Sequence, residues 1–169
     1  MRKNLVLLGM MGAGKSTLGK IVAKKCGIKF IDTDLLIQKE NSMSVKEIFE
    51  KKGEKFFRKE EEKIVFNSLK QENCVIALGG GAFINDKIRQ KILSDTISIW
   101  LNVKIEELNR RIKKNLKRPL LKYNDNVETL KDIFDKRSGI YKLSNYKIDC
   151  DNNNLENISN KIINIYEKH

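Results

Sequence analysis

The stretch Gly9-Met-Met-Gly-Ala-Gly-Lys15-Ser16 matches the pattern G-x-x-x-x-G-K-[ST] at every fixed position. It follows an apolar run that begins near Asn4, and a helical pattern begins at Lys15. Glycines let the backbone fold around a phosphate so that several N–H groups point inward, and the helix N-terminus adds partial positive charge. The stretch therefore predicts a P-loop, which binds the phosphates of a nucleoside triphosphate between a strand and a helix.

Two side chains of this loop can act on the phosphates directly. We expect Lys15 to contact the β- and γ-phosphates and the Ser16 hydroxyl to bind Mg²⁺. The predicted nucleotide-binding residues of the loop are Gly12, Ala13, Gly14, Lys15, Ser16 and Thr17. The pattern predicts a nucleoside triphosphate as the co-substrate and Mg²⁺ as the cofactor, but it does not identify the group that accepts the phosphate.

Short apolar runs alternate with stretches of helical periodicity along the rest of the chain. The expected strands are Asn4–Gly9, Lys29–Asp32, Cys74–Leu78, Thr96–Asn102 and Lys147–Cys150. The expected helices are Lys15–Cys26, Leu35–Glu40, Ser44–Gly53, Glu54–Gln71, Asn85–Leu93, Ile105–Leu116, Val127–Leu143 and one from Leu155 onward. This alternation predicts a parallel sheet with helices on both faces. We expect one domain over residues 1–169, with an irregular lid at about 112–126 that carries the only proline, Pro119.

Length and rare residue types exclude several classes of protein. A chain of 169 residues that is 40% hydrophobic can bury a core, and no apolar run approaches the ~20 residues of a membrane span. The single histidine, His169, is the last residue, which argues against a histidine base or a Ser-His-Asp triad. Cys26, Cys74 and Cys150 lie far apart and favour a reducing compartment, so we expect a cytoplasmic protein with no membrane partner.

The net charge of +12 allows two interpretations. It can indicate binding to nucleic acid or attraction of small anionic substrates. Of the 34 basic residues, 27 are Lys and 7 are Arg, a bias that AT-rich codon usage would produce. Helicase-like motifs and interleaved aromatic residues are missing, so we expect no nucleic-acid partner. A nucleic-acid-binding ATPase is the alternative from another class.

Asp32 and Asp34 flank Thr33 directly after the second expected strand. Open α/β sheets bind ligands at the carboxyl ends of their strands. One carboxylate can address the metal and its waters while the other addresses the acceptor hydroxyl, and a carboxylate is the candidate base because no internal histidine exists. Alternatively, the pair opens the next helix as a turn or an N-cap, and the two roles can coexist.

Arg58 differs from the many lysines in the charged helix around it. It follows two phenylalanines, and Glu61, one turn later, can hold its guanidinium group. An oriented guanidinium is a natural bidentate partner for a substrate carboxylate. The run Gly79-Gly80-Gly81 follows a buried strand and would allow the backbone to approach a ligand closely.

Taken in order, these motifs resemble those of the shikimate kinase family. The matching segments are the P-loop, Asp32-Thr-Asp34, Gly-Glu-x-x-Phe-Arg-x-x-Glu at 53–61, Ala-Leu-Gly-Gly-Gly at 77–81, Arg118-Pro-Leu-Leu and Arg137-x-x-x-Tyr141. They occur in the family order from residue 9 to about 150, so the resemblance covers nearly the whole chain. It implies a P-loop kinase fold of the α/β class, with a five-stranded parallel sheet flanked by helices and a mobile lid. It also implies ATP-dependent phosphorylation of the 3-hydroxyl of shikimate, in aromatic amino acid biosynthesis.

The resemblance assigns residues to the acceptor. Asp34, Arg58, Gly80 and Arg137 match the family positions that bind shikimate. The shikimate carboxylate would meet Arg58 and Arg137, and its 3-hydroxyl would meet Asp34.

The resemblance also assigns residues to the nucleotide and the metal. Lys15 and Arg118 match the residues that contact the transferred phosphoryl group, and Arg111 matches the arginine that lies against adenine. Ser16 matches the metal ligand, and Asp32 matches the residue that orients Mg²⁺ through water.

One departure from the family pattern concerns the adenine side. The family usually carries Asp-Thr and then a proline after the last strand, whereas Cys150 follows Asp149 here and no proline follows. The departure puts the residues that contact adenine in question, but it does not affect the expected reaction.

A gluconate-type or nucleotide-type kinase is the alternative function within the same class. We expect the protein to be a monomer.

Overall fold

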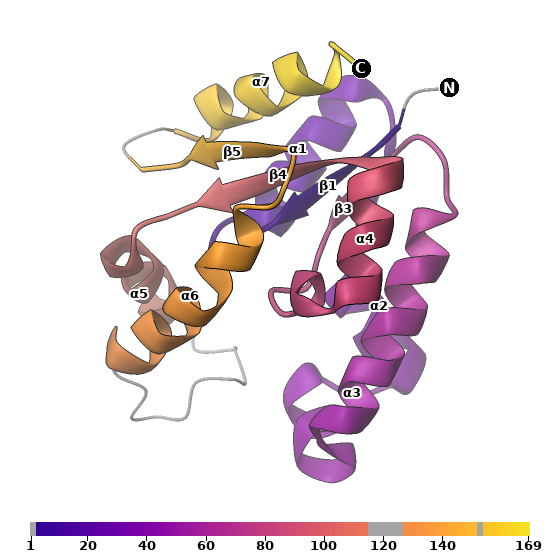
Figure 1. Ribbon diagram of the computed structural model, residues 1–169, viewed down its shortest axis with the longest axis vertical. Helices are drawn as coiled ribbons and strands as arrows, with labels where there is room; N and C mark the ends of the chain where they lie inside the picture. Colours follow the sequence, from indigo (N-terminus) through magenta and orange to yellow (C-terminus); the bar gives the residue numbers. More distant parts are fainter. Residues whose placement is uncertain (1–2, 115–126, 152–153) are drawn as a thin grey trace.

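The computed structural model describes residues 3–114, 127–151 and 154–169 (Figure 1). The strands are β1 (Asn4–Leu8), β2 (Lys29–Asp32), β3 (Cys74–Ala77), β4 (Thr96–Asn102) and β5 (Tyr146–Asp149). The helices are α1 (Lys15–Cys26), α2 (Thr33–Asn41), α3 (Val45–Leu69), the short 3₁₀ helix η1 (Ala82–Ile84), α4 (Asp86–Asp95), α5 (Ile105–Lys114), α6 (Val127–Tyr141) and α7 (Leu155–Tyr166). The predicted alternation of strands and helices is confirmed.

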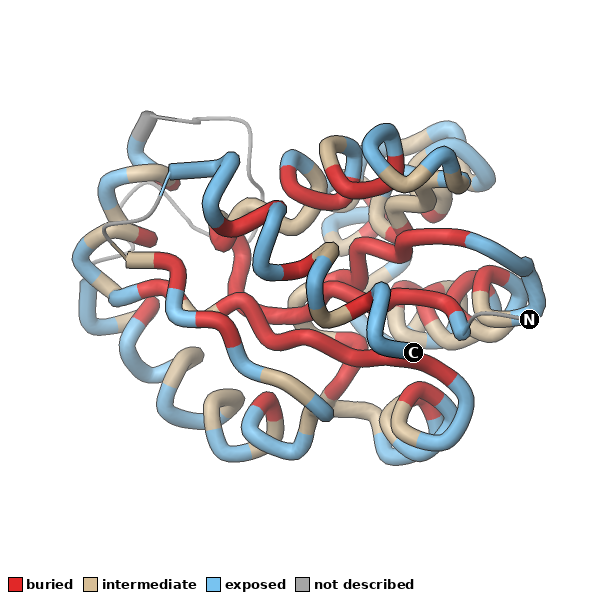
Figure 2. Tube along the Cα trace, turned by 90° about the horizontal axis from the view of Figure 1, so that it is seen from above, coloured by how far each residue is buried: buried red, intermediate tan, exposed pale blue. Residues whose placement is uncertain are grey.

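The five strands form one parallel sheet in the order β2-β3-β1-β4-β5. Helices α1 and α7 pack together on one face of the sheet, and α4 packs against β4 on the other (Figure 1). A sheet covered on both faces needs strands that are apolar on both sides, and β1 is buried along its whole length. Figure 2 shows the buried strands running through the middle of the molecule, with exposed residues on the outer sides of the helices.

Helices α2 and α3 pair with each other and extend beyond one end of the sheet (Figure 1). They enclose a small apolar cluster of their own, made of Ile37, Ile48, Phe57 and Ile64. The predicted capping box at the start of α3 is present, because the Ser44 hydroxyl accepts from the Glu47 N–H and the Glu47 carboxylate accepts from the Ser44 N–H. The two helices expected at 44–53 and 54–71 adjoin at Gly53, whose φ of 80° breaks the helical path inside α3.

The remaining differences from the sequence prediction are local. The 3₁₀ helix η1 was not predicted, because three residues are too few to show a period. In the predicted lid, residues 112–114 form the end of α5, and residues 115–126 lie outside the described part of the chain. Within residues 3–114, 127–151 and 154–169, no helix is long and apolar enough to cross a membrane.

Candidate active site

The P-loop connects β1 to α1 at the carboxyl edge of the sheet. Gly14 is the N-cap of α1 and has a φ of 95°, which side chains rarely tolerate. No side chain in the described part of the chain caps this N-terminus. At Gly9, an added Cβ would lie 2.7 Å from the carbonyl oxygen of Leu101, so the loop passes too close to β4 for any other residue. The helix N-terminus therefore remains available to bind an anion, as the motif predicts.

The ammonium group of Lys15 lies over the loop that precedes it. Its Nζ atom donates to the carbonyl oxygens of Gly9 and Met10, each at 2.9 Å. These two bonds hold the charge at the mouth of the phosphate-binding turn. Lys15 is thus already positioned near the expected β- and γ-phosphates.

Asp32 joins the nucleotide side of the site to the acceptor side. Its Oδ2 atom accepts from the Ser16 hydroxyl at 2.5 Å, and its Oδ1 atom accepts from the Leu35 N–H at 3.2 Å. The second bond makes Asp32 the N-cap of α2, so the N-cap alternative is confirmed beside its contact with Ser16. Because the chain turns into α2 here, the neighbouring Asp34 points elsewhere.

The Asp34 carboxylate lies against the first glycine of the run 79–81. A Cβ on Gly79 would come within 2.6 Å of Asp34 Oδ1 and 3.0 Å of Glu61 Oε1. Glycine at this position thus makes room for two of the protein's own carboxylates. Burial raises the pKa of Glu61, the positive charge of Arg58 partly offsets this rise, and the negative charge of Asp34 adds to it.

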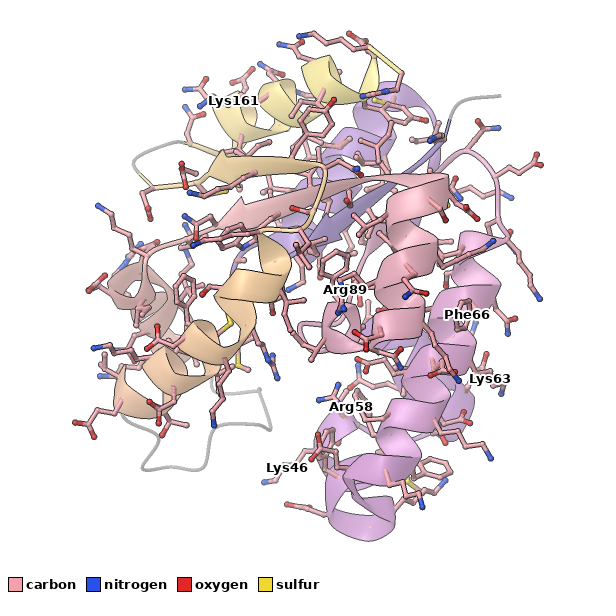
Figure 3. All side chains as sticks on the ribbon, viewed as in Figure 1. Lys46, Arg58, Lys63, Phe66, Arg89 and Lys161 are labelled. Atoms are coloured by element: carbon pink, nitrogen blue, oxygen red, sulfur yellow. The ribbon has the colours of Figure 1, made fainter. Side chains whose placement is uncertain are left out.

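Arg58 is held by carboxylates on both sides along α3. Its Nη1 atom donates to Glu61 at 2.7 Å, and its Nε and Nη2 atoms lie 3.3 Å from Glu54. The predicted orientation of Arg58 by Glu61 is confirmed. A Cβ on Gly81 would lie 2.5 Å from Arg58 Nη1, so this glycine also makes room for a functional side chain. Figure 3 shows Arg58 and Lys63 leaving α3 on different sides.

Gly80 lies between the acceptor side and the P-loop. A Cβ on Gly80 would lie 3.5 Å from Arg137 Nη1 and 3.6 Å from the carbonyl oxygen of Gly9. The hydroxyl of Tyr141, one turn after Arg137 on α6, donates to the carbonyl oxygen of Gly80. The two residues of the Arg-x-x-x-Tyr motif therefore both contact the glycine run.

These elements surround one cavity of about 460 Å³. The predicted site residues that line it are Gly12, Gly14, Lys15, Ser16, Thr17, Asp32, Asp34, Arg58, Gly80 and Arg137. Groups expected to hold an acceptor carboxylate, a phosphate and a metal thus face one space, although they come from five separate parts of the chain.

Among the predicted site residues that the structure describes, Ala13 and Arg111 do not line this cavity. Ala13 is buried in the P-loop, and Arg111 donates from Nε to Glu107 at 2.6 Å and from Nη1 to the carbonyl oxygen of Gly12 at 3.4 Å. Arg111 therefore lies beside the P-loop. Arg118 lies outside the described residues.

Cys150 follows β5 in the segment expected to approach adenine. Its side chain is buried and its thiol lies 3.4 Å from the carbonyl oxygen of Ile148, as a weak donor. Burial raises the pKa of this thiol to about 12, so it stays protonated at neutral pH. At this position the chain carries a buried thiol where the resemblance implies a hydroxyl.

Comparison with known proteins identifies the family. The family model described as shikimate kinase matches residues 11–167. The chain belongs to the shikimate kinase family. A shikimate kinase from Caldanaerobacter subterraneus is 39% identical over 98% of this chain and 97% of its own length. One from Sulfurihydrogenibium is 38% identical over 95% of this chain and 96% of its own.

Solved structures agree with this assignment. A shikimate kinase from Acinetobacter baumannii in complex with shikimate has a TM-score of 0.94 at 28% identity, and the match covers 99% of this chain and 94% of that one. A gluconokinase from Sinorhizobium meliloti, at 15% identity and a TM-score of 0.63, shares the fold alone. The chain is therefore an ATP- and Mg²⁺-dependent phosphotransferase, its activity is the phosphorylation of shikimate, and the gluconate-type alternative is not supported.

Sequence reasoning missed part of the cavity wall. Leu35, Gln38, Val45 and Phe57 line the cavity but were not predicted as site residues. Phe57 also belongs to the apolar cluster between α2 and α3. It falls in the motif at 53–61, but that motif predicted roles only for Arg58 and Glu61. Leu35, Gln38 and Val45 belong to no motif, so their place in the cavity wall could be found only from the fold.

Proposed function

We propose that the chain transfers the γ-phosphoryl group of ATP to the 3-hydroxyl of shikimate in the cavity between the P-loop and the glycine run. The observation that carries this proposal is the convergence of Lys15, Asp34, Arg58 and Arg137 on that cavity. A P-loop alone would fit many kinases. Two arginines and a carboxylate opposite it fit an acceptor that carries both a carboxylate and a hydroxyl.

On the acceptor side, Arg58 and Arg137 bind the carboxylate of shikimate and Asp34 receives the proton of the 3-hydroxyl. Arg58 is suited to this role because Glu54 and Glu61 hold its guanidinium group in place. Phosphoryl transfer requires positioning and neutralisation of charge more than covalent chemistry, so a fixed acceptor contributes much of the rate.

On the nucleotide side, Lys15 neutralises the phosphates and Arg111 lies against adenine. Ser16 and Asp32 present oxygen atoms to the cavity from one hydrogen-bonded pair, which fits Mg²⁺, a cation that prefers oxygen ligands and retains water. Mg²⁺, when bound, supplies neutralisation of the negative charge on the phosphate oxygens. Arg118 is assigned to the transferred phosphoryl group from the family motif.

We also propose the wider setting in which the chain acts. Residues 1–169 would act as one domain and as a monomer, with a lid at about 112–126. Cys26, Cys74 and Cys150 are odd in number and far apart in the sequence, which supports a reducing cytoplasmic compartment. The charge of +12 would attract the anionic substrates, without a nucleic-acid or membrane partner.

The test is a coupled assay of the purified protein with ATP, Mg²⁺ and three acceptor classes. Shikimate should be phosphorylated, gluconate and nucleoside monophosphates should not, and ³¹P–¹H NMR of the product should place the phosphate on the 3-oxygen. Lys15→Met should nearly abolish the transfer in a folded protein, because a methionine supplies no charge to the phosphates. Lys24→Met, an exposed position on the same helix, is the matched control. Phosphorylation of gluconate in place of shikimate would contradict the proposal.

A further inference from the structure

The residues Gly79–Gly81, here called the glycine turn, connect β3 to η1. Two of the turn's carbonyl groups are satisfied locally: Gly79 accepts from the Ala82 N–H and Gly81 accepts from the Ile84 N–H, both at 3.1 Å. The N–H of Gly79 and the carbonyl group of Gly80 instead bond to side-chain hydroxyls from distant parts of the chain. These two hydroxyls belong to Thr33 and Tyr141.

The Thr33 side chain forms one more hydrogen bond between the segments that follow β2 and β3, beyond the point where the backbone pairing of these strands ends. The β2–β3 ladder ends with the pair Asp32 and Ala77, because the chain turns into α2 at Thr33. The Thr33 hydroxyl then accepts from the Gly79 N–H at 2.9 Å and lies 3.4 Å from the carbonyl oxygen of Ala77, to which it donates. Thr33 is fully buried, so no water competes with these bonds.

Tyr141 fixes the turn from the opposite side. Its ring is fully buried and packs at 5.9 Å from Trp100 of β4, which leaves its hydroxyl directed at the Gly80 carbonyl group. Burial raises the pKa of Tyr141, although the charge of Arg137 partly offsets the rise, so the hydroxyl remains a proton donor. The half-buried carbonyl group of Gly80 thus accepts from a residue at the end of α6.

The position of the turn matters because it contacts most of the groups assigned to the acceptor. Added Cβ atoms on its three glycines would lie 2.6 Å from Asp34, 2.5 Å from Arg58 and 3.5 Å from Arg137, and Gly80 also adjoins the P-loop. A shift of a few tenths of an ångström would therefore change the spacing between the acceptor groups and the phosphates. A misplacement of about 1 Å can lower the rate by about 10²-fold.

We propose that Thr33 and Tyr141 are positioning residues, which hold the glycine turn from two sides and thereby set the geometry of the shikimate pocket. The proposal rests on the proposed function, because it assumes that this pocket binds the acceptor. Neither residue contacts reacting atoms in this scheme. Their effect passes through the Gly79 N–H and the Gly80 carbonyl group.

Kinetics of paired variants test the proposal. Thr33→Val and Tyr141→Phe each remove a hydroxyl with little change in shape. The first variant loses two hydrogen bonds and the second loses one. Each should raise the KM for shikimate about 3- to 10-fold, as the net loss of one or two hydrogen bonds implies. The KM for ATP should change less than the KM for shikimate. Thr33→Ser retains the hydroxyl and should restore the wild-type KM for shikimate.

Two controls remove similar hydroxyls elsewhere. Thr96→Val deletes a buried hydroxyl that donates to the Ile92 carbonyl group at the end of α4. Tyr146→Phe deletes a hydroxyl on β5 that lies 2.8 Å from Nε2 of His169. Both should leave the KM for shikimate within about twofold of wild type. Equal rises in the controls and in the test variants would overturn the proposal, because they would reflect general loss of packing.

A readout without activity separates this proposal from the proposed function. Amide exchange at Gly79 should be faster in the substrate-free Thr33→Val variant than in wild type, and the ¹³C shift of the Gly80 carbonyl should move in Tyr141→Phe. Unchanged exchange, carbonyl shift and KM for shikimate would overturn the positioning role. A wild-type protein inactive on shikimate would instead contradict the proposed function, while faster Gly79 exchange would still support the hold of Thr33 on the turn. If Thr33→Val does not fold, the KM for shikimate of Tyr141→Phe, compared with that of Tyr146→Phe, tests the proposal.

Discussion

The Ser16 hydroxyl donates to Asp32 at 2.5 Å, so the two groups assigned to the metal contact each other across the gap between α1 and β2. The same carboxylate caps α2 through the Leu35 N–H. One side chain therefore connects the first turn of the nucleotide-binding helix to the start of the helix that carries Asp34. Substitutions of Asp32 can separate the role of its negative charge at the metal from its role as the N-cap of α2.

We expect Asp32→Asn to weaken the apparent affinity for Mg²⁺ by about 10-fold or more while leaving the fold stable, since asparagine is an equally good N-cap. Asp32→Ala should weaken the affinity similarly and also lower the free energy of unfolding by about 1 kcal/mol, because the cap is lost. Mg²⁺ titrations of activity and urea unfolding of both variants would measure the two effects. Unchanged Mg²⁺ dependence in Asp32→Asn would mean that the carboxylate serves α2 alone.

Arg58→Ala should raise the KM for shikimate far more than the KM for ATP. Removing one partner of a bound carboxylate costs about 2–5 kcal/mol, which corresponds to about 30-fold or more. Arg110→Ala is the matched control, because Arg110 also pairs with a glutamate, Glu107, but is largely exposed. A similar rise in both KM values for Arg58→Ala would indicate a structural role only.

Gly79→Ala tests whether the first glycine of the run is needed for the protein's own carboxylates. The added methyl group would lie 2.6 Å from Asp34 Oδ1, so Asp34 must move and kcat should fall, by about 10²-fold if the base is displaced by 1 Å. Gly139→Ala places a methyl group where no atom of the described residues lies within 4 Å, and it should leave kcat unchanged. Equal activity of the two variants would contradict the role assigned to Asp34.

The sequence predicts the fold almost completely because its main signals are local. The P-loop, the buried run before it and the capping box at Ser44 each specify a structure within a few residues, and all three are confirmed. The orientation of Arg58 by Glu61 was equally predictable, since it depends on a helical spacing of three.

Contacts between distant segments could not be predicted in the same way. The sequence suggests that the glycine run allows a ligand to approach, whereas Gly79 and Gly81 first make room for Asp34 and Arg58. The bond from Thr33 to Gly79 spans 46 residues and depends on the order in which β2 and β3 pair. Neither spacing nor composition contains that information.

Arg118 is assigned from its motif alone, and its removal should have a large kinetic effect. We expect Arg118→Ala to lower kcat by at least about 10²-fold, since arginines that contact a transferred phosphoryl group contribute about 10³–10⁵ in rate. Lys114→Ala and Lys122→Ala should each change kcat by less than about threefold, because neither lysine belongs to the motif that assigns Arg118 to the phosphoryl group. Three similar small effects in steady-state kinetics would show that Arg118 has no special role.

The buried carboxylate of Glu61 should make the stability of the folded protein depend on pH. Burial raises its pKa above the ordinary value of 4.5, and Arg58 offsets this only in part. The folded protein therefore keeps this proton to higher pH than the unfolded chain does. The contribution of Glu61 to stability is fully present below pH 4.5 and declines as the pH rises through the folded-state pKa. When the free energy of unfolding in urea is compared between wild type and Glu61→Gln, the difference (wild type minus variant) should fall as the pH rises.

Asp95 provides a control of opposite sign. Hydrogen bonds from Lys91 and Ser94 lower its pKa, so its contribution is present above the ordinary pKa and is lost as the pH falls. The stability of wild type minus that of Asp95→Asn should therefore rise with pH. If the Glu61 difference also rose with pH, the attraction of Arg58 would outweigh burial, and Glu61 would hold Arg58 as a full ion pair even before a substrate carboxylate arrives.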